Sequence, residues 1–282
     1  LCSGGVIWSN NYNGLSDGCG ATGSATVTFK ATDSCGNFST TMGTFTIRDT
    51  TGPVIDTKAN DKIVECDGAG NAAELAAWLA DNGGARASDL CSGGVIWSND
   101  YNGLSDGCGK TGSATVTFTA TDSCGNSSST TATFTIIDTI APTITTEAQD
   151  ATVECDGAGN AAELAAWLAD NGGARASDIC SGGVIWSNDY SGLSDGCGAT
   201  GSATVTFKAT DSCGNYSTTT ATFTIRDTIK PTFVGPLPQD ASMCIDVPNP
   251  PVLTATDNCG TAAVTFTESI DSVSTPRVKI YT

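Results

Sequence analysis

The sequence predicts an all-β protein built from tandem sandwich domains, in which each full domain carries one short inserted α-helix. Two sequence motifs, CSGGVIWSN and SDGCG, each occur three times. Their copies are 89 residues apart, as Cys2, Cys91 and Cys180 show. Threonine alternates with apolar residues along the two longest predicted strands of each repeat. A unit of this length has the size of a small domain rather than of a solenoid turn.

The repeat divides the chain into four expected domains. Segments 66–142 and 155–231 are nearly identical, which indicates a recent duplication of one unit. The outer segments are expected to be the C-terminal part of one repeat and the N-terminal part of another, so that the chain is a window on a much longer protein. The expected boundaries are 1–51, 52–140, 141–229 and 230–282.

Each full repeat is expected to start with a short strand, DKIVEC in the first, which leads into the helix. Asn71 is a candidate N-cap, and Glu74 three residues later completes the pattern of a capping box. Leu75 and Trp78 fall on one helix face. The glycine pair that follows should end the helix. The predicted helices span 71–82 and 160–171.

Three more strands should complete the repeat. A strand around Trp97 precedes SATVTFTATD and STTATFTII, where Val116, Phe118 and Phe134 alternate with threonines. A period of two with threonine outside predicts antiparallel strands that have one buried face. DSCGN between them is a turn. These strands predict a small immunoglobulin-like β-sandwich. In the last repeat Cys244 and Cys259 are closer in sequence than the equivalent cysteines of the full repeats, which predicts that this repeat lacks the helix.

The composition excludes several classes of function. Twelve basic and 30 acidic side chains give a net charge of -18 with no histidine. This charge argues against nucleic acid and anionic membrane surfaces as partners, and it favours divalent cations as counterions. No apolar run is long enough for insertion into a membrane. Without histidine, a nucleophile motif or a distinct carboxylate pair, no enzymatic activity is expected.

Thirteen cysteines in small domains predict disulfides and an oxidising, extracellular setting. Cys108 and Cys124 flank one strand, about 30 Å apart, so they cannot pair with each other. If the Trp97 strand runs antiparallel to the next strand, Cys91 and Cys124 share one end of the sandwich. Four cysteines allow three connectivities, and this topology predicts Cys2–Cys35, Cys66–Cys108, Cys91–Cys124, Cys155–Cys197 and Cys180–Cys213. Cys19, Cys244 and Cys259 remain without a partner.

Three other motifs are interpreted as structural. Zinc is disfavoured because there is no CxxC and no histidine. CDGAGNAA matches a dinucleotide-binding pattern, but no βαβ unit surrounds it. Trp97 and Trp186 could stack on sugars, although a tryptophan on a sandwich strand more often belongs to the core.

Aspartates near the domain junctions are candidate calcium ligands. Carboxylates that meet at a junction could bind Ca²⁺ through oxygen atoms and stiffen the string of domains. The alternative is solvated surface charge, with aspartate as a turn former. The candidates are Asp49, Asp61, Asp122, Asp138, Asp150, Asp211 and Asp227.

TATDSCGN, VECDG, the Asp-Thr-x-x-Pro junction and four cysteines per repeat resemble HYR-like, immunoglobulin-like repeats. Such repeats occur in very large cell-surface adhesins of Bacteroidota, including gliding-type adhesins exported by type 9 secretion. The resemblance covers nearly the whole chain and implies an extracellular, cell-surface stalk. It also makes Thr50, Thr139 and Thr228 candidate glycosylation sites, the alternative being unmodified linker residues.

The sequence therefore predicts a structural protein: a disulfide-stapled, semi-rigid stalk or filament of a giant surface adhesin. The alternative is a multivalent module that binds glycans. The expected partners are neighbouring repeats of the same chain, and surface glycans or other copies of the filament.

Overall fold

A computed structural model describes residues 4–91, 93–237, 252–271 and 278–281. The chain forms two compact units. The first comprises Leu1–Thr139 with Ile179–Ser181, and the second comprises Ile140–Asp178 with Gly182–Thr282. No described helix is both long and apolar enough to cross a lipid bilayer.

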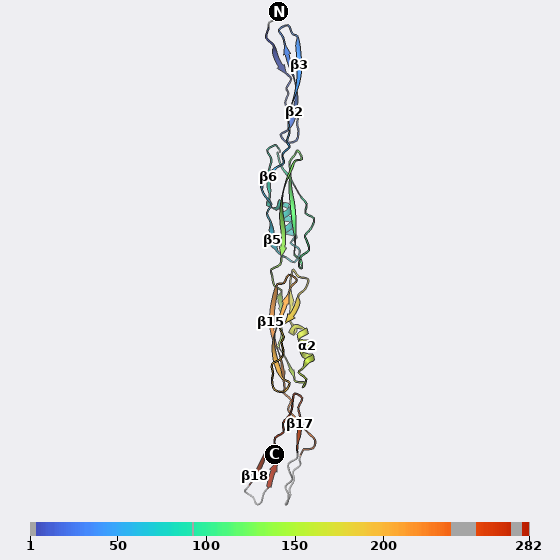
Figure 1. The fold of residues 1–282 in the computed structure, drawn as a ribbon, viewed down its shortest axis with the longest axis vertical. Helices are drawn as coiled ribbons and strands as arrows, with labels where there is room; N and C mark the ends of the chain where they lie inside the picture. Colours follow the sequence, from blue (N-terminus) through green and yellow to red (C-terminus); the bar gives the residue numbers. More distant parts are fainter. Residues whose placement is uncertain (1–3, 92, 238–251, 272–277, 282) are drawn as a thin grey trace. The chain divides into compact units, whose positions relative to one another are not determined.

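The first unit begins with one antiparallel sheet. Its strands are β1 (Ile7–Asn10), β2 (Gly23–Thr32) and β3 (Phe38–Ile47), in the order β1-β2-β3. The β2 and β3 strands pair over ten residues (Figure 1). The expected turn DSCGN connects them, because Asp33 and Asn37 close it with a backbone hydrogen bond.

A four-stranded sheet in the order β5-β9-β8-β7 forms the main layer of the first full repeat. The antiparallel pairing of β7 with β8, and of β8 with β9, confirms the prediction. The β5 strand runs parallel to β9, a pairing that the sequence analysis did not predict. The strands are β5 (Lys62–Glu65), β7 (Ile96–Asn99), β8 (Gly112–Thr121) and β9 (Ser127–Ile137).

The predicted alternation places the apolar residues inside. Val116, Phe118 and Phe134 are fully buried. On the other face, the hydroxyl oxygens of Thr115 and Thr133 lie 3.0 Å apart across the strand pair. A second, two-stranded sheet of β4 (Val54–Thr57) and β6 (Arg86–Ser88) was not predicted.

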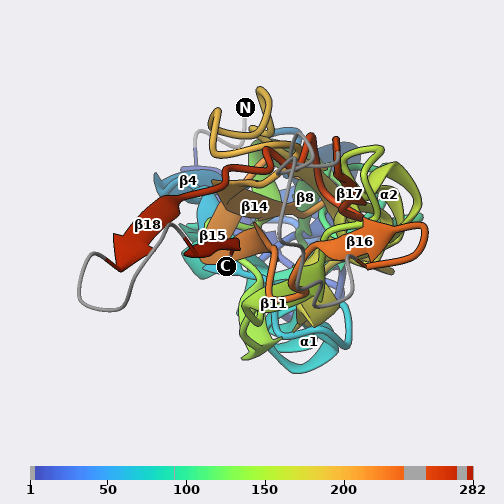
Figure 2. The ribbon, with the colours of Figure 1, turned by 90° about the horizontal axis from the view of Figure 1, so that it is seen from below.

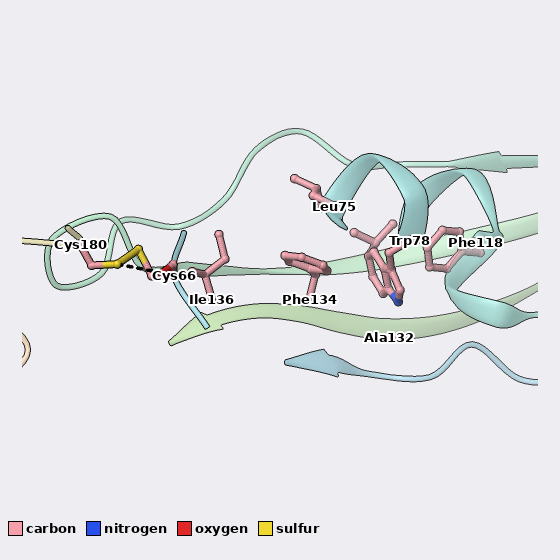
Figure 3. Close-up of a cluster of buried hydrophobic side chains, with 9 residues drawn as sticks. Cys66, Leu75, Trp78, Phe118, Ala132, Phe134, Ile136 and Cys180 are labelled. Atoms are coloured by element: carbon pink, nitrogen blue, oxygen red, sulfur yellow. Dashed lines mark hydrogen bonds between the residues drawn. A yellow bond between two sulfur atoms is a disulfide. The ribbon is translucent and has the colours of Figure 1, made fainter. Parts of the chain in front are cut away.

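The predicted helix is confirmed as α1 (Ala72–Ala80), followed by the 3-10 turn η1 (Asn82–Gly84). Figure 3 shows Leu75 and Trp78 pointing from α1 toward the sheet. The Trp78 ring lies 5.2 Å from the ring of Phe118 and 5.5 Å from that of Phe134. The indole nitrogen of Trp78 donates a hydrogen bond of 3.1 Å to the carbonyl of Asn60. The helix is therefore fixed to the core by both packing and a polar contact.

The predicted capping box is wrong. Asn71 is the N-cap, but it adopts the left-handed conformation (φ 50°, ψ 37°) and makes no side-chain capping bond. Its amide instead donates to the carbonyl of Glu65 at 2.9 Å and accepts from the backbone nitrogen of Asp67 at 3.2 Å. The side chain is thus committed to joining the start of the helix to the end of β5.

Two core positions of the full repeat have counterparts in residues 1–51. Phe29 and Phe45 stand where Phe118 and Phe134 stand one repeat later, and they are 40% and 62% exposed rather than fully buried. The two sheets share three strands of nearly the same sequence, and the second sheet also contains β5. Phe118 and Phe134 are buried beneath α1, whose Trp78 ring contacts both of them.

The second unit repeats this architecture, with α2 (Ala161–Ala169) labelled in Figures 1 and 2. Its main sheet has the order β11-β15-β14-β13, and β10 pairs with β12. No helix lies in the described residues of 230–282, where β16 pairs with β17 and β18 with β19. The all-β class with one helix in each full repeat is confirmed, whereas the domain boundaries stay predictions. The bounds are β10 (Thr143–Thr146), β11 (Ala151–Glu154), η2 (Asn171–Gly173), β12 (Arg175–Ser177), β13 (Ile185–Asn188), β14 (Gly201–Thr210), β15 (Tyr216–Arg226), β16 (Thr232–Val234), β17 (Thr254–Thr256), β18 (Glu268–Asp271) and β19 (Val278–Tyr281).

Candidate functional site at the repeat boundaries

Disulfides join cysteines that are more than one repeat apart in sequence. Their separations of 105, 114 and 104 residues all exceed the 89-residue repeat. Each bond therefore connects one repeat to the next. The pairs are Cys19–Cys124, Cys66–Cys180 and Cys155–Cys259.

Four of the predicted pairings are consequently wrong: Cys66–Cys108, Cys91–Cys124, Cys155–Cys197 and Cys180–Cys213. Their premise was right, because β7 does run antiparallel to β8. The cysteines do gather at the ends of the repeat, but the bonding partner at each end comes from the neighbouring repeat.

The other cysteines divide into three groups. Cys108 and Cys213 are also disulfide-bonded. Among the described residues, Cys91 and Cys197 are free thiols. Cys2 and Cys244 lie outside the described residues, so the predicted Cys2–Cys35 pairing stays a prediction.

The last glycine of SDGCG, directly after the cysteine, lets two repeats approach each other. In SDGCG, Gly20 has a φ of 57°, and a Cβ atom there would lie 2.1 Å from the carbonyl oxygen of Cys91. The next residue, Ala21, donates its backbone N–H to that same carbonyl at 2.6 Å. No other residue type fits this combination of a left-handed backbone and a close approach.

The same contact recurs further along the chain. Lys110 donates its backbone N–H to the carbonyl of Cys180 at 2.8 Å, and Ala199 donates to Cys259 at 3.0 Å. Gly198, like Gly20, has a positive φ of 65°, and its Cβ would lie 2.2 Å from the carbonyl of Cys259. Each of these carbonyls thus receives a hydrogen bond from the SDGCG loop of the preceding repeat.

Buried Asp122 holds the DSCGN turn together at this boundary. One carboxylate oxygen accepts the backbone N–H groups of Cys124 at 2.8 Å and Asn126 at 2.9 Å, and the other accepts the Asn126 side-chain amide at 2.8 Å. Burial by itself would raise the pKa of Asp122, but these hydrogen bonds outweigh it and lower the pKa. Asp122 is therefore a charged acceptor that fixes Cys124 in place. Asp211 has the same bonds one repeat later.

Two of the predicted calcium ligands come together in the first unit. Oxygen atoms of Asp49 and Asp122 and the sulfur of Cys124 all lie within 4.8 Å of one another. The Oδ2 atom of Asp49 is buried and has no hydrogen-bond partner. The sulfur belongs to a disulfide, so it is not a thiolate ligand. The cluster thus supplies two carboxylates, and Ca²⁺, which takes six to eight oxygens, would complete its shell with water or carbonyl groups.

Three of the other predicted ligands accept backbone hydrogen bonds away from this cluster. Asp61 accepts the backbone N–H of Thr133 at 2.8 Å, and Asp150 accepts that of Thr222 at 2.7 Å. These two carboxylates pin a loop to the longest strand of each repeat. Asp227 accepts the N–H of Ile229 at 3.2 Å, and Asp138 directly follows β9.

Two glutamates that the sequence analysis missed bind the junction threonines. Glu65 accepts the backbone N–H of Thr139 at 2.7 Å and its hydroxyl at 2.9 Å. Glu154 binds Thr228 in the same way, at 2.9 and 2.7 Å. These bonds from the Thr228 N–H and hydroxyl lower the pKa of Glu154. A glutamate precedes the cysteine of VECDG in both repeats, but no local signal shows that it binds a threonine 74 residues away.

This pairing bears on the predicted glycosylation sites. An O-glycan replaces the hydroxyl hydrogen that Thr139 and Thr228 donate to the glutamates. Glycosylation of the folded protein at these two residues would therefore remove a hydrogen bond. Thr50 is exposed, and its modification stays a prediction.

The strand tryptophans of the two full repeats belong to the core rather than to an open platform. Trp97 and Trp186 are partly buried and pack against the buried clusters of their repeats. Trp8, at the equivalent position in residues 1–51, is 68% exposed.

Comparison with known proteins gives a distant likeness. Neither a family model nor a curated protein matches the chain. Among solved structures, repeats 3–6 of protocadherin gammaB7 match at 17% identity and a TM-score of 0.33, over 88% of this chain and 71% of that one. Drosophila N-cadherin repeats 1–4 match at 14% identity and a TM-score of 0.28, over 74% of this chain and 59% of that one. Likenesses at such low scores carry no argument, so the assignment of tandem, disulfide-bonded β-sandwich repeats rests on the structure itself.

Proposed function

We propose that this chain is part of an extracellular stalk that holds an adhesive surface protein away from its cell. The observation that carries the proposal is the set of disulfides between successive repeats. A stalk needs many like units that are joined durably, and each of these bonds joins two units covalently.

The chemistry of the bonds supports an extracellular location. Disulfides persist in oxidising compartments and are rare where thiols are kept reduced. The resemblance to repeats of large Bacteroidota adhesins, with export by type 9 secretion, fits such a location. A net charge of -18 adds solubility and mutual repulsion between neighbouring filaments.

The carboxylates support a structural rather than a catalytic role. Asp61 and Glu65 accept hydrogen bonds from backbone N–H groups of distant segments, and Asp122 accepts them within its own turn. They are therefore committed to holding turns and strands in place.

The proposal includes a divalent cation beside Asp49 and Asp122. The buried, unpartnered oxygen of Asp49 would gain a ligand bond, and the positive ion would offset the repulsion between the two carboxylates. Its contribution would be to stiffen the boundary between residues 1–51 and the next repeat.

Electron microscopy of the native protein sheared from its source cells tests the proposal. We expect thin beaded threads with a repeat of roughly 40 Å, the length of one strand plus a junction. Compact particles without threads would overturn the stalk. Threads that become limp in a calcium chelator would support the cation, and threads that keep their stiffness would overturn that part alone.

A further inference from the structure

We infer that the disulfides form overlapping closed loops, so that no single peptide bond between Cys19 and Cys259 is needed to hold the chain together. The inference deepens the proposed stalk function. It describes a stalk that stays covalently continuous after one main-chain cut.

The overlap follows from the three bonds. The loop closed by Cys19 and Cys124 contains Cys66, at which the second loop begins. The loop closed by Cys66 and Cys180 contains Cys155, at which the third begins and runs to Cys259. Every peptide bond from Cys19 to Cys259 therefore lies inside at least one loop.

Pairing within repeats would not have this property. Bonds such as Cys66–Cys108 and Cys91–Cys124 would close loops inside a repeat and leave each junction as a single strand of main chain. The junctions are exposed to solvent, with Ile140 49% exposed and Thr139 also exposed. Exposed connections are where proteases cut most readily. The observed pairing thus protects the chain where it is most open to attack.

The central bond is itself sheltered. Cys66 is 3% exposed and Cys180 is 2% exposed, and Figure 3 shows their sulfurs at the end of the core cluster that contains Ile136. A reductant reaches a buried disulfide poorly. The bond that spans the junction is therefore less accessible than the peptide bonds that it backs up.

The same loops limit how far tension can stretch the chain. The shortest covalent route runs from Cys19 to Cys124, along the main chain to Cys155, and across to Cys259. Its main-chain part consists largely of β9, β10 and β11, which as strands are already close to full extension, about 3.3 Å per residue. The two bypassed loops, of 105 and 104 residues, would each release about 350 Å if their bond were absent.

A cut at a chosen site tests the inference. A recognition sequence for a site-specific protease is inserted between Ile140 and Ala141 of the full chain, and free thiols such as Cys91 and Cys197 are first blocked with iodoacetamide. After digestion, the protein should run as one 28.4 kDa species without reductant and as two fragments with reductant. The reduced lane verifies that cutting occurred.

The matched control removes the bonds that cross the cut. Because Cys108 is also disulfide-bonded, the control carries Cys66→Ser and Cys108→Ser together. It should separate into two fragments without reductant. A second site, between Asn102 and Gly103 in an exposed loop, guards against misfolding at the junction. Two separate fragments from the parent protein without reductant, at either site, would overturn the inference, whatever microscopy shows of the stalk.

Discussion

At the scale of single residues, glycine decides how closely two repeats can approach. Gly198 combines a φ of 65° with a Cβ position 2.2 Å from the carbonyl oxygen of Cys259. Gly214 in the same repeat has a φ of 95° but open space around it. Both glycines have a positive φ, but only Gly198 lies against a carbonyl oxygen of the next repeat.

We expect Gly198→Ala to destabilise the protein more than Gly214→Ala. The backbone strain alone should cost about 1–2 kcal/mol at either position. At Gly198 the new methyl group must also displace the carbonyl of Cys259, which weakens the hydrogen bond from Ala199. Urea unfolding of both variants measures the difference, and equal losses would show that the contact is not maintained in solution.

The Glu154–Thr228 pair makes stability depend on pH. The N–H and hydroxyl of Thr228 lower the pKa of Glu154 below its ordinary value of 4.5. The folded state thus favours the ionised form, and this stabilisation is present above about pH 4.5 and lost as the pH falls through the lowered pKa.

The variant Thr228→Val keeps the shape but removes the hydroxyl donor. We therefore expect it to lose less stability than the parent between about pH 5 and pH 3. The control is Glu163→Gln, which removes an exposed carboxylate from α2. Melting temperatures across this range measure the effect, and a parent-like pH slope for Thr228→Val would show that the hydroxyl does not bind Glu154.

Residue roles were predicted only where they depend on local sequence. The DSCGN turn was foreseen because aspartate, glycine and asparagine are turn formers in any context. The glutamate that binds each junction threonine is 74 residues away in sequence. Nothing local reveals such a partner, and it becomes visible only once β5 is known to lie parallel to β9.

At the scale of elements, α1 covers one face of the main sheet, and its side chains complete the hydrophobic core. The ring of Trp78 contacts both Phe118 and Phe134, which are fully buried. Burial of one aromatic side chain of this size contributes several kcal/mol.

We expect Trp78→Ala to lower the free energy of unfolding by about 3–5 kcal/mol, because it leaves a cavity between the helix and the sheet. The variant Trp78→Phe keeps most of the packing but loses the hydrogen bond to Asn60, so its loss should be smaller. Denaturation followed by near-ultraviolet circular dichroism measures both. A loss below about 1 kcal/mol for Trp78→Ala would mean that α1 is dispensable.

The elements were predicted where periodicity marks them. Alternation in β8 and β9 placed Val116 and Phe134 inside correctly, and the spacing of Leu75 and Trp78 revealed the helix. The β4–β6 pair, whose strands have four and three residues, was missed. The parallel direction of β5 was missed because alternation shows which face is buried and not which strand lies alongside.

At the scale of the whole molecule, the disulfide pairing lay beyond sequence reasoning for a reason specific to repeats. Strand lengths excluded the pair Cys108–Cys124 correctly. They did not show that Cys124 bonds Cys19, the counterpart of Cys108 one repeat earlier, or that Cys66 bonds Cys180, the counterpart of Cys91 one repeat later. The choice depends on how the end of one domain meets the next, and no pattern within a repeat encodes that contact.

Bonds that reach beyond one repeat also impose an order in time. Cys66 has no partner until Cys180 has been made, 114 residues later. At about 5–20 residues per second, that delay is roughly ten seconds. Cys66 therefore stays reduced until the next repeat has been made, and each new repeat becomes covalently joined to the one before it only when both are present.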